Sequence, residues 1–575
     1  MLGEIKDKLK FSYLNELKEK DFFSTLDIFF ATYLNSKTDE EAIFLAYLFL
    51  ISRFGFISIE IKDDNTIYPS VEDLNLDTKD FLDIDTFVKK VILGSKKLSD
   101  KIVYLGDNSD ENHPKKPVCR FKNFYYLQKN YVFEKKIIKN LERLENQTPT
   151  KLFDEDVFFK ILKNENFLNL EQKKAVENAF FNSISLILGG PGTGKTYVAS
   201  HLIEILSKSY DSSKKNNFKI AITSFTGKAT AHLKSKILKV VDNVDIDAKT
   251  LHLLLNLKEG KPKFFDENKL NYDLIIVDEA SMLDLKLTAH LLNSIKKGSR
   301  IIFIGDPNQL PPIESGNVFS EISNFENIEM VHLKQAKRFE NSKITDLANA
   351  IKNSDEKALN AIFEKSDFYD IEDIYHAKKI ILDMAKTSFF ESDSKGIKIE
   401  NVFNLLKDFI ILSSIKKGPF GVEMLNQEIF SLFYNKADLN DYLFVPIIIT
   451  KNNYNLDLFN GEFGILKIQK TLNGPIKKEA YFQIDAKIQK FEIFYLSSYE
   501  YAYSISIHKS QGSEFKKVVI IIPDGSENFG KELFYTAITR AKNEFSVFST
   551  KRMVKDLIKV SSFKKSALSA SKKQH

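Results

Sequence analysis

One segment of this sequence has the residue types and spacing that proteins use to hold the phosphates of a nucleotide. It follows a short apolar run, Ile184–Leu188, and precedes a helical pattern over Tyr197–Leu206. Glycines in such a loop let backbone N–H groups point at the phosphates, and the helix N-terminus adds a partial positive charge. The lysine is placed to reach the β- and γ-phosphates of ATP, and the next threonine to ligate Mg²⁺. The residues of this predicted phosphate loop are Gly189, Gly190, Pro191, Gly192, Thr193, Gly194, Lys195 and Thr196.

An acidic pair, Asp278 and Glu279, follows directly on the apolar run Leu274–Val277. Acidic pairs usually lie on the solvated surface, but an apolar run leading straight into this one indicates the end of a buried strand. There Asp278 suits the Mg²⁺ shell, and Glu279 suits the orientation or deprotonation of the attacking water.

A third strand end and two arginines complete the predicted hydrolytic site. Ile301–Ile304 leads into a loop that carries Gln309, which we expect on the same rim as the phosphate loop, where it could sense the γ-phosphate. Arg338 and Arg540 follow at a distance. Phosphoryl transfer needs cations that arrive as the site closes, and the guanidinium stays charged. From the residues alone, a surface ion pair is the commoner role for either arginine.

Two series of short apolar runs predict two α/β units with parallel sheets, because strands covered on both faces are apolar throughout. Gly461 to Ser498 alternates apolar and polar residues and predicts a small β insertion, whereas the chain up to Gln147 has helical spacing. Ala42–Ile51 is too short to span a bilayer, which needs about 20 residues, and predicts a buried helix. The first series comprises Ile184–Leu188, Ile220–Ser224, Leu274–Val277 and Ile301–Ile304, and the second Phe409–Leu412, Val445–Ile449, Val518–Ile522 and Phe545–Phe548.

These patterns divide the chain into predicted domains. We expect a helical partner-docking domain, two α/β domains, a β insertion within the second of them, and a Ser- and Lys-rich disordered tail. The predicted ranges are 1–147 for the first, 148–335 for the first α/β domain, 336–460 with 499–562 for the second, 461–498 for the insertion and 563–575 for the tail.

The composition is that of a soluble globular protein. Of 575 residues, 43% are hydrophobic and 28% charged, and the balance of 83 basic against 78 acidic residues gives +5. This permits nucleic-acid binding without arguing for it. The single cysteine, Cys119, excludes an internal disulfide and fits a reducing cytosol, and the charged start of the chain is unlike a signal peptide. We therefore expect a cytoplasmic, bacterial protein with no membrane association.

Taken in order, these segments resemble the motifs of superfamily 1 helicases, in particular the RecD family of superfamily 1B, over about residues 165 to 550. RecD is the alpha subunit of exodeoxyribonuclease V, the RecBCD complex. The resemblance rests on nine segments in the correct order, and two more, 418–426 and 458–462, narrow it to RecD. One departure is Phe225, where the family often has a proline. The matched segments are 168–172, 189–196, 224–229, 250–252, 278–281, 305–311, the one with Arg338, 506–515 and 533–541.

The resemblance implies two RecA-like P-loop domains with ATP between them, and an SH3-like β insertion that helps to hold the strand. Alternatively, the β insertion is only a stabilising flap. Gln172 would contact the adenine, and Gly512 and Glu514 the nucleotide. Hydroxyls and a lysine suit phosphate oxygens, and histidine can stack on a base. The implied single-stranded DNA contacts are Thr226, Lys228, Thr250, His252, Ser506 and His508, although a histidine taken alone more often has a core role.

The implied activity is ATP-dependent 5′–3′ DNA unwinding in double-strand break repair and recombination, as part of a heterotrimer with RecB-like and RecC-like subunits. The DNA partner would be a duplex end or a single strand with a 5′ end. We expect no nuclease site in this chain. The alternatives are a stand-alone RecD-like helicase and, more remotely, a nucleotide-gated scaffold subunit that moves no DNA. Intact Lys195, Glu279, Arg338 and Arg540 argue against the scaffold.

Overall fold

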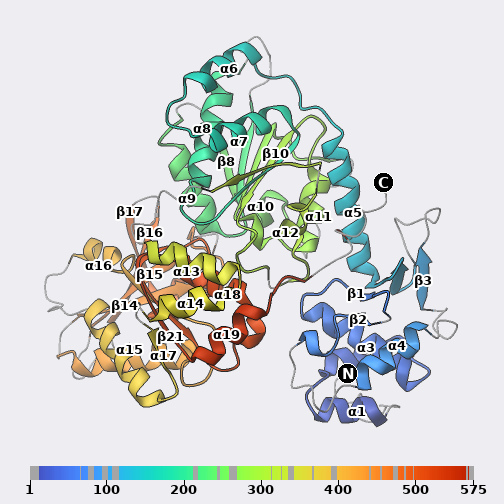
Figure 1. Ribbon diagram of the computed structural model, residues 1–575. Helices are drawn as coiled ribbons and strands as arrows, with labels where there is room; N and C mark the ends of the chain where they lie inside the picture. Colours follow the sequence, from blue (N-terminus) through green and yellow to red (C-terminus); the bar gives the residue numbers. More distant parts are fainter. Residues whose placement is uncertain are drawn as a thin grey trace.

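The chain folds into three units, seen in Figure 1 at the lower right, top and lower left. No helix that the structure describes is long and apolar enough to cross a membrane. Arg338 and most of the polar loop 106–116 lie outside the described residues. The computed structural model describes residues 12–564 and 568, apart from 65, 75–82, 94–100, 106–114, 211–217, 242–245, 258–267, 313, 326, 335–341, 365–367, 390–397, 439–441, 454–455, 470–476, 485–486 and 497.

The N-terminal unit contains the expected helices and also a five-stranded sheet in the order β2-β1-β5-β4-β3, which the sequence analysis did not anticipate. The predicted buried helix is confirmed within α3, where Thr38 accepts the N-terminal capping bond and Ala42–Leu48 is buried throughout. The strands are two to four residues long, too short to show a period of two. Their bounds and those of the helices are α1 Ser12–Glu19, α2 Thr25–Tyr33, α3 Asp39–Arg53, β1 Ser58–Ile61, β2 Ile67–Tyr68, α4 Asp83–Leu93, β3 Ile102–Leu105, β4 Val118–Phe121, β5 Phe124–Leu127 and α5 Gln128–Glu145.

The unit that follows, which we call the first core, is a six-stranded parallel sheet in the order β11-β6-β10-β9-β7-β8. All four predicted strands of the first series are present, and helix α5 of the N-terminal unit packs on α11 beside it (Figure 1). The elements are α6 Glu155–Asn164, α7 Leu170–Phe181, β6 Ile184–Gly189, α8 Lys195–Lys208, β7 Ile220–Ser224, α9 Gly227–Ile237, β8 Ile246–Thr250, α10 Leu251–Leu254, β9 Leu274–Asp278, α11 Leu285–Ser294, β10 Arg300–Gly305, α12 Val318–Ile322 and β11 Glu329–Leu333.

The second core is a five-stranded parallel sheet in the order β12-β21-β20-β13-β19. Three of the four predicted strands of the second series lie in it, as β13, β20 and β21. Its elements are α13 Ser342–Lys352, α14 Glu356–Phe363, β12 Phe368–Tyr369, α15 Ile374–Phe389, α16 Ile399–Leu405, β13 Phe409–Ser413, α17 Val422–Lys436, β19 Ser504–Ser506, β20 Phe515–Ile522, α18 Lys531–Ile538, β21 Ala541–Ser549 and α19 Lys551–Lys559.

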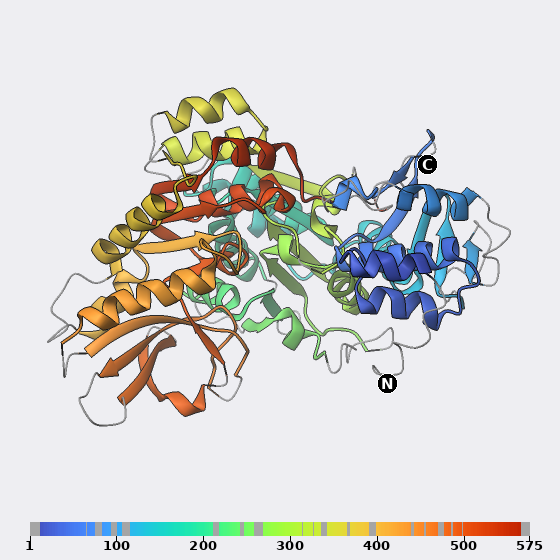
Figure 2. The same ribbon diagram turned by 90° about the horizontal axis from the view of Figure 1, so that it is seen from below.

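The fourth predicted strand, Val445–Ile449, was wrongly assigned to this parallel sheet. It lies in β14 Tyr442–Ile449, which pairs antiparallel with β15 Phe463–Gln469 and β18 Tyr499–Tyr501. Strands β16 Lys477–Ile484 and β17 Lys487–Glu492 complete this sheet, which Figure 2 shows in orange as an outlying layer. The apolar residues of β14 pack with those of the second core, so the strand is apolar throughout and its pattern cannot reveal its neighbours.

Two positions of the expected disordered tail are packed against other parts of the chain. Lys564 donates a hydrogen bond to the Phe54 carbonyl oxygen, and Leu568 is buried in the hydrophobic cluster that the N-terminal unit shares with the first core. Most other residues of 563–575 lie outside the described residues. The division of the chain into separate domains stays a prediction.

Candidate ATP site and nucleic-acid interface

The phosphate loop lies between β6 and α8, as predicted. Gly192 and Gly194 have φ values of 77° and 88°, in the left-handed region that favours glycine. The Thr193 hydroxyl donates a 2.8 Å hydrogen bond to the Gly190 carbonyl oxygen and so braces the turn. The Lys195 ammonium donates to the carbonyl oxygens of Gly189 and Gly190 at 2.7 and 3.0 Å. The cation is therefore held within the loop, at the place where phosphates would need it.

Gln172 lies against the same loop. It is 2% exposed, and a Cβ on Gly194 would be only 2.9 Å from its Nε2. Its Oε1 accepts a 3.1 Å hydrogen bond from the Asn169 backbone N–H, while Asn169 caps the Gln172 N–H in return. This capping box at the start of α7 fixes the glutamine beside the phosphate loop, and its expected contact with the adenine stays a prediction.

The acidic pair ends strand β9. Burial and the neighbouring Glu279 carboxylate raise the pKa of Asp278 to about 7. The Glu279 backbone, at φ 50°, is in a strained left-handed conformation, and its N–H donates a 2.9 Å bond to Asp278 Oδ1. Among the described residues no three His, Cys, Asp or Glu side chains gather into a metal cluster. This donor set fits Mg²⁺, which is usually held by one or two carboxylates together with nucleotide phosphates.

The loop after β10 is buried beside this pair. Gln309 is 3% exposed, and its Oε1 accepts no hydrogen bond from the described part of the chain. A buried amide without its partner is costly, so this group is suited to a ligand or water at the site. The neighbouring Asp306 is fully buried and bonds to the second core.

Arg540 follows α18 in the second core and is 3% exposed. Its guanidinium donates to the backbone oxygens of Thr536 and Ser513, both at 3.1 Å. Neutral carbonyl partners leave the positive charge uncompensated. Both residues that hold Arg540 also bond to the first core, through Leu310 and Lys228, so Arg540 lies close to the boundary of the two cores. The other predicted arginine, Arg338, is outside the described residues.

Two of the predicted DNA contacts cap helices at the carboxyl ends of neighbouring strands. Thr226, after β7, accepts the capping bond of α9, and Thr250, at the end of β8, that of α10. His252 makes an edge-to-face contact with Phe225. These positions share one rim of the first core because β7 and β8 are parallel.

Lys228 joins this rim to the second core. Its ammonium donates a 2.7 Å hydrogen bond to the Ser513 hydroxyl and lies over the Phe463 ring, 4.8 Å from its centroid. Burial lowers the pKa of Lys228 to about 8, against the opposing effect of the Glu462 carboxylate. Segments 226–229 and 506–513, distant in sequence, therefore meet.

The remaining predicted site residues lie in the second of these segments or directly after it. Ser506 accepts a 3.4 Å bond from the Lys509 N–H, and His508 contacts the Phe529 ring edge. Gly512, at φ 72°, faces Ala229. Glu514 forms an ion pair with Lys542 at 3.4 Å, so its expected place at the nucleotide stays a prediction.

Besides Lys228, several residues without a predicted role join the two cores at this site. Tyr535 bonds to Asp306, the Leu310 N–H donates to the Thr536 hydroxyl, and Gln511 Nε2 donates to the Leu310 carbonyl oxygen. All these residues lie within segments that resemble helicase motifs, so the sequence could have indicated that they are functional. Only the tertiary structure shows which of them contact one another.

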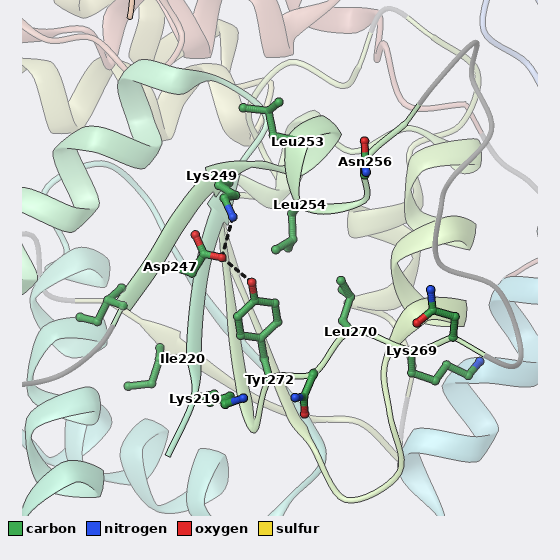
Figure 3. A pocket seen from close by; sticks show the side chains of 13 residues that line it. Lys219, Ile220, Asp247, Lys249, Leu253, Leu254, Asn256, Lys269, Leu270 and Tyr272 are labelled. Atoms are coloured by element: carbon green, nitrogen blue, oxygen red, sulfur yellow. Dashed lines mark hydrogen bonds and ion pairs between the residues drawn. The ribbon is translucent and has the colours of Figure 1, made fainter. Parts of the chain in front are cut away.

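A pocket of about 690 Å³ lies elsewhere, against strands β7 and β8 (Figure 3). Asp247 within it accepts hydrogen bonds from Lys249 and Tyr272. No residue of 189–196 lines this pocket, and we assign it no part in nucleotide binding.

A phosphate loop in one parallel-sheet unit, with the Tyr535 hydroxyl of a second unit lying against it, is the arrangement expected of ATP-driven helicase motors. Family models agree: residues 172–315 match the AAA domain, and residues 501–547 match the UvrD-like helicase C-terminal domain.

Comparison with individual relatives identifies the family within this class of helicase motors. The chain is 30% identical to the RecBCD enzyme subunit RecD of Buchnera aphidicola from Acyrthosiphon pisum, over 92% of this chain and 95% of the relative. It is 24% identical to the ATP-dependent RecD2 DNA helicase of Deinococcus radiodurans, over 66% of this chain and 48% of the relative. Among solved structures, the Candida albicans Pif1 helicase gives a TM-score of 0.39 at 18% identity, over 68% of this chain and 96% of that chain. The chain belongs to the RecD family and is a nucleotide-binding DNA helicase.

Proposed function

We propose that this chain is a 5′–3′ DNA helicase subunit that works with RecB-like and RecC-like partners at DNA ends in double-strand break repair. This proposal rests on how much of the length of each relative aligns with this chain. The Buchnera RecD subunits align over 95% and 99% of their length, whereas the RecD2 helicase aligns over 48% of its own. The aligned part of the chain thus includes most of the N-terminal unit as well as the motor.

Each site residue has a role in this proposal. Lys195 neutralises phosphate charge, and Glu279 orients or deprotonates the attacking water. Gln309 senses the γ-phosphate through its side-chain N–H groups, and its buried Oε1, which has no partner in the described part of the chain, can accept a hydrogen bond from the attacking water. Asp278 and Thr196 would hold Mg²⁺, which would neutralise charge on the phosphates when bound.

Arg540 contributes a cation from the second core, and closure of the two cores brings it to the nucleotide. Arg338 would also bring a cation to the nucleotide, and this role rests only on the resemblance to the helicase motifs. The strand would lie along the rim formed by Thr226, Thr250 and the segment 506–508, where hydroxyls can contact phosphates. Alternate closing and opening of the cores would then move the strand.

The test is ATP-dependent unwinding of duplexes with a 5′ tail, a 3′ tail or blunt ends, by the chain alone and with RecB-like and RecC-like subunits. We expect opening of the 5′-tailed duplex, co-purification of a heterotrimer, and no activity in the Lys195→Gln variant. Unwinding of the 3′-tailed duplex alone would overturn the polarity. Failure to bind either partner, with 5′–3′ unwinding intact, would favour the stand-alone alternative.

A further inference from the structure

We propose that Tyr535 is a positioning residue of the motor, whose hydroxyl couples the phosphate loop of the first core to Arg540 of the second. This inference rests on the role proposed for Arg540. It assigns a function to a hydrogen bond between Tyr535 and Asp306, and neither residue is a predicted site residue.

The hydrogen bond joins two buried groups from different cores. The Tyr535 hydroxyl donates to Asp306 Oδ2 at 3.0 Å, and the two residues are 7% and 0% exposed. Oδ1 of the same carboxylate accepts from the backbone N–H and the side-chain amide of Asn308, at 3.0 and 3.1 Å. Asp306 therefore fixes the loop that carries Gln309 and holds the tyrosine at the same time.

The same hydroxyl lies against the phosphate loop. A Cβ on Gly190 would be 3.2 Å from Tyr535 Oη and 3.9 Å from Asp306 Oδ2. The carbonyl oxygen of Gly190 is one of the two acceptors of the Lys195 ammonium. A movement of the loop on nucleotide binding would therefore displace the pair of Tyr535 and Asp306.

The helix turn that carries Tyr535 also orients Arg540. Thr536, the next residue, accepts a 2.9 Å bond from the Leu310 N–H through its hydroxyl, and its carbonyl oxygen accepts from Arg540 Nε at 3.1 Å. The first core, the turn at Tyr535 and Thr536, and the guanidinium thus form one continuous chain of hydrogen bonds. A displaced turn would move the arginine.

The hydrogen bond between Tyr535 and Asp306 has the chemistry of a permanent link between the two cores. Burial and the Asp306 carboxylate raise the pKa of Tyr535 well above its usual range, so the hydroxyl keeps its proton and donates at any physiological pH. A bond to a buried charged acceptor is among the stronger hydrogen bonds in proteins. Phenylalanine at this position would remove only that bond.

The experiment compares Tyr535→Phe, Arg540→Ala and the double variant in DNA-stimulated ATP hydrolysis and in nucleotide binding. The matched control is Tyr503→Phe, because the Tyr503 hydroxyl is buried in the second core and has no hydrogen-bond partner among the described residues. We expect Tyr535→Phe to lower kcat about tenfold to a hundredfold with nucleotide Kd unchanged, and to lower the thermal midpoint somewhat because the buried Asp306 carboxylate loses a partner. Tyr503→Phe should be like wild type in all three measurements. In the Arg540→Ala background, Tyr535→Phe should have little further effect, since it acts through that arginine.

Wild-type turnover in Tyr535→Phe, or an effect fully additive with that of Arg540→Ala, would overturn the inference. If Arg540→Ala itself kept normal turnover, the proposed role of Arg540 would fail instead, so the two failures are distinguishable. Should Tyr535→Phe fold poorly, Asp306→Asn and Asp306→Ala provide the second comparison. The amide of Asn can still bond to the hydroxyl, so Asp306→Asn should keep at least about ten times the turnover of Asp306→Ala. Equal turnover in the two would count against the coupling.

Discussion

Cationic side chains at this site are held by backbone carbonyl oxygens rather than by carboxylates. Lys195 donates to Gly189 and Gly190, and Arg540 to Thr536 and Ser513. No ion pair involving either residue occurs in the described part of the chain. A neutral acceptor orients a cation without cancelling its charge, so both remain available to anionic phosphates.

Replacing Arg540 by alanine should lower the rate of ATP hydrolysis by about 10³-fold and leave nucleotide affinity largely intact, because a cation that acts at the transition state adds little to ground-state binding. Steady-state hydrolysis and binding of a fluorescent nucleotide would measure the two effects. Arg552→Ala is the control, since the Arg552 side chain is 92% exposed and Asp556 is its one ion-pair partner within the described ranges. Weaker nucleotide binding with full turnover at saturation would contradict the assignment.

A pH effect is expected at Lys228. Its pKa is lowered from 10.5 to about 8 by burial, so between these values the unfolded chain binds the extra proton and stability rises with pH. Relative to Lys228→Met, wild type should therefore gain unfolding free energy from about pH 8 to pH 10.5, by up to about 1.4 kcal/mol per unit. Urea unfolding of both proteins at a series of pH values would show it. Parallel curves would mean that the ammonium is not buried.

At the scale of elements, helix α9 begins where the first core meets the outlying antiparallel sheet. A Cβ on Gly227 would be 2.4 Å from the Phe459 ring, which makes this a contact that only glycine permits. The next residue, Lys228, contacts Phe463 at the start of β15 and Ser513 of the second core. The start of α9 thus contacts both the outlying antiparallel sheet and the second core.

We expect Gly227→Ala to push α9 away from the Phe459 loop and to lower both the thermal midpoint and the stimulation of ATP hydrolysis by DNA, at a cost of about 1–3 kcal/mol for overpacking. Adding Phe459→Ala should relieve the clash, so the double variant should be more stable than the sum of the single changes predicts. Thermal unfolding of the four proteins tests this. Additive effects would show that the two residues are not in contact.

The strands also show which elements apolar patterns in the sequence can predict. Strands β6, β7, β9 and β10 were predicted to within a residue or two at each end, because strands buried on both faces are apolar along their whole length. The same pattern misassigned β14, which is equally apolar but pairs antiparallel. The sheet of the N-terminal unit was not anticipated, since four-residue strands such as β4 and β5 carry too few residues to show a period.

At the scale of the whole molecule, the segment after α19 ties the second core to the rest of the chain. The buried Glu532 carboxylate accepts hydrogen bonds from the Ser561 hydroxyl, at 2.8 Å, and from the Ser562 N–H, at 2.7 Å. Beyond them, Lys564 bonds to Phe54 in the N-terminal unit, and Leu568 is buried in the hydrophobic cluster that the N-terminal unit shares with the first core. One short segment therefore connects the second core to the N-terminal unit and to this shared cluster.

Truncation after Val560 should lower the unfolding free energy of the second core by about 1–3 kcal/mol, because Glu532 would remain buried without its partners. It should also speed proteolysis between the N-terminal unit and the first core. Thermal unfolding and limited trypsin digestion would measure these changes. A truncation after Leu568, which keeps all four contacts, is the control and should behave like wild type. Equal behaviour of the two truncations would refute the role of this segment.

The sequence by itself determined where the phosphate loop and the acidic pair lie, and the four central strands of the first parallel sheet, because these depend on residues that are close together in the chain. Gly192, Gly194 and Lys195 act within one turn, and Asp278 and Glu279 end one strand. Only the tertiary structure decided which groups meet across the boundary of the cores: Lys228 with Ser513, and Tyr535 with Asp306 and Gly190. Pairs of this kind are separated by more than 200 residues, and no local pattern encodes a contact that arises only when two independently patterned units pack together.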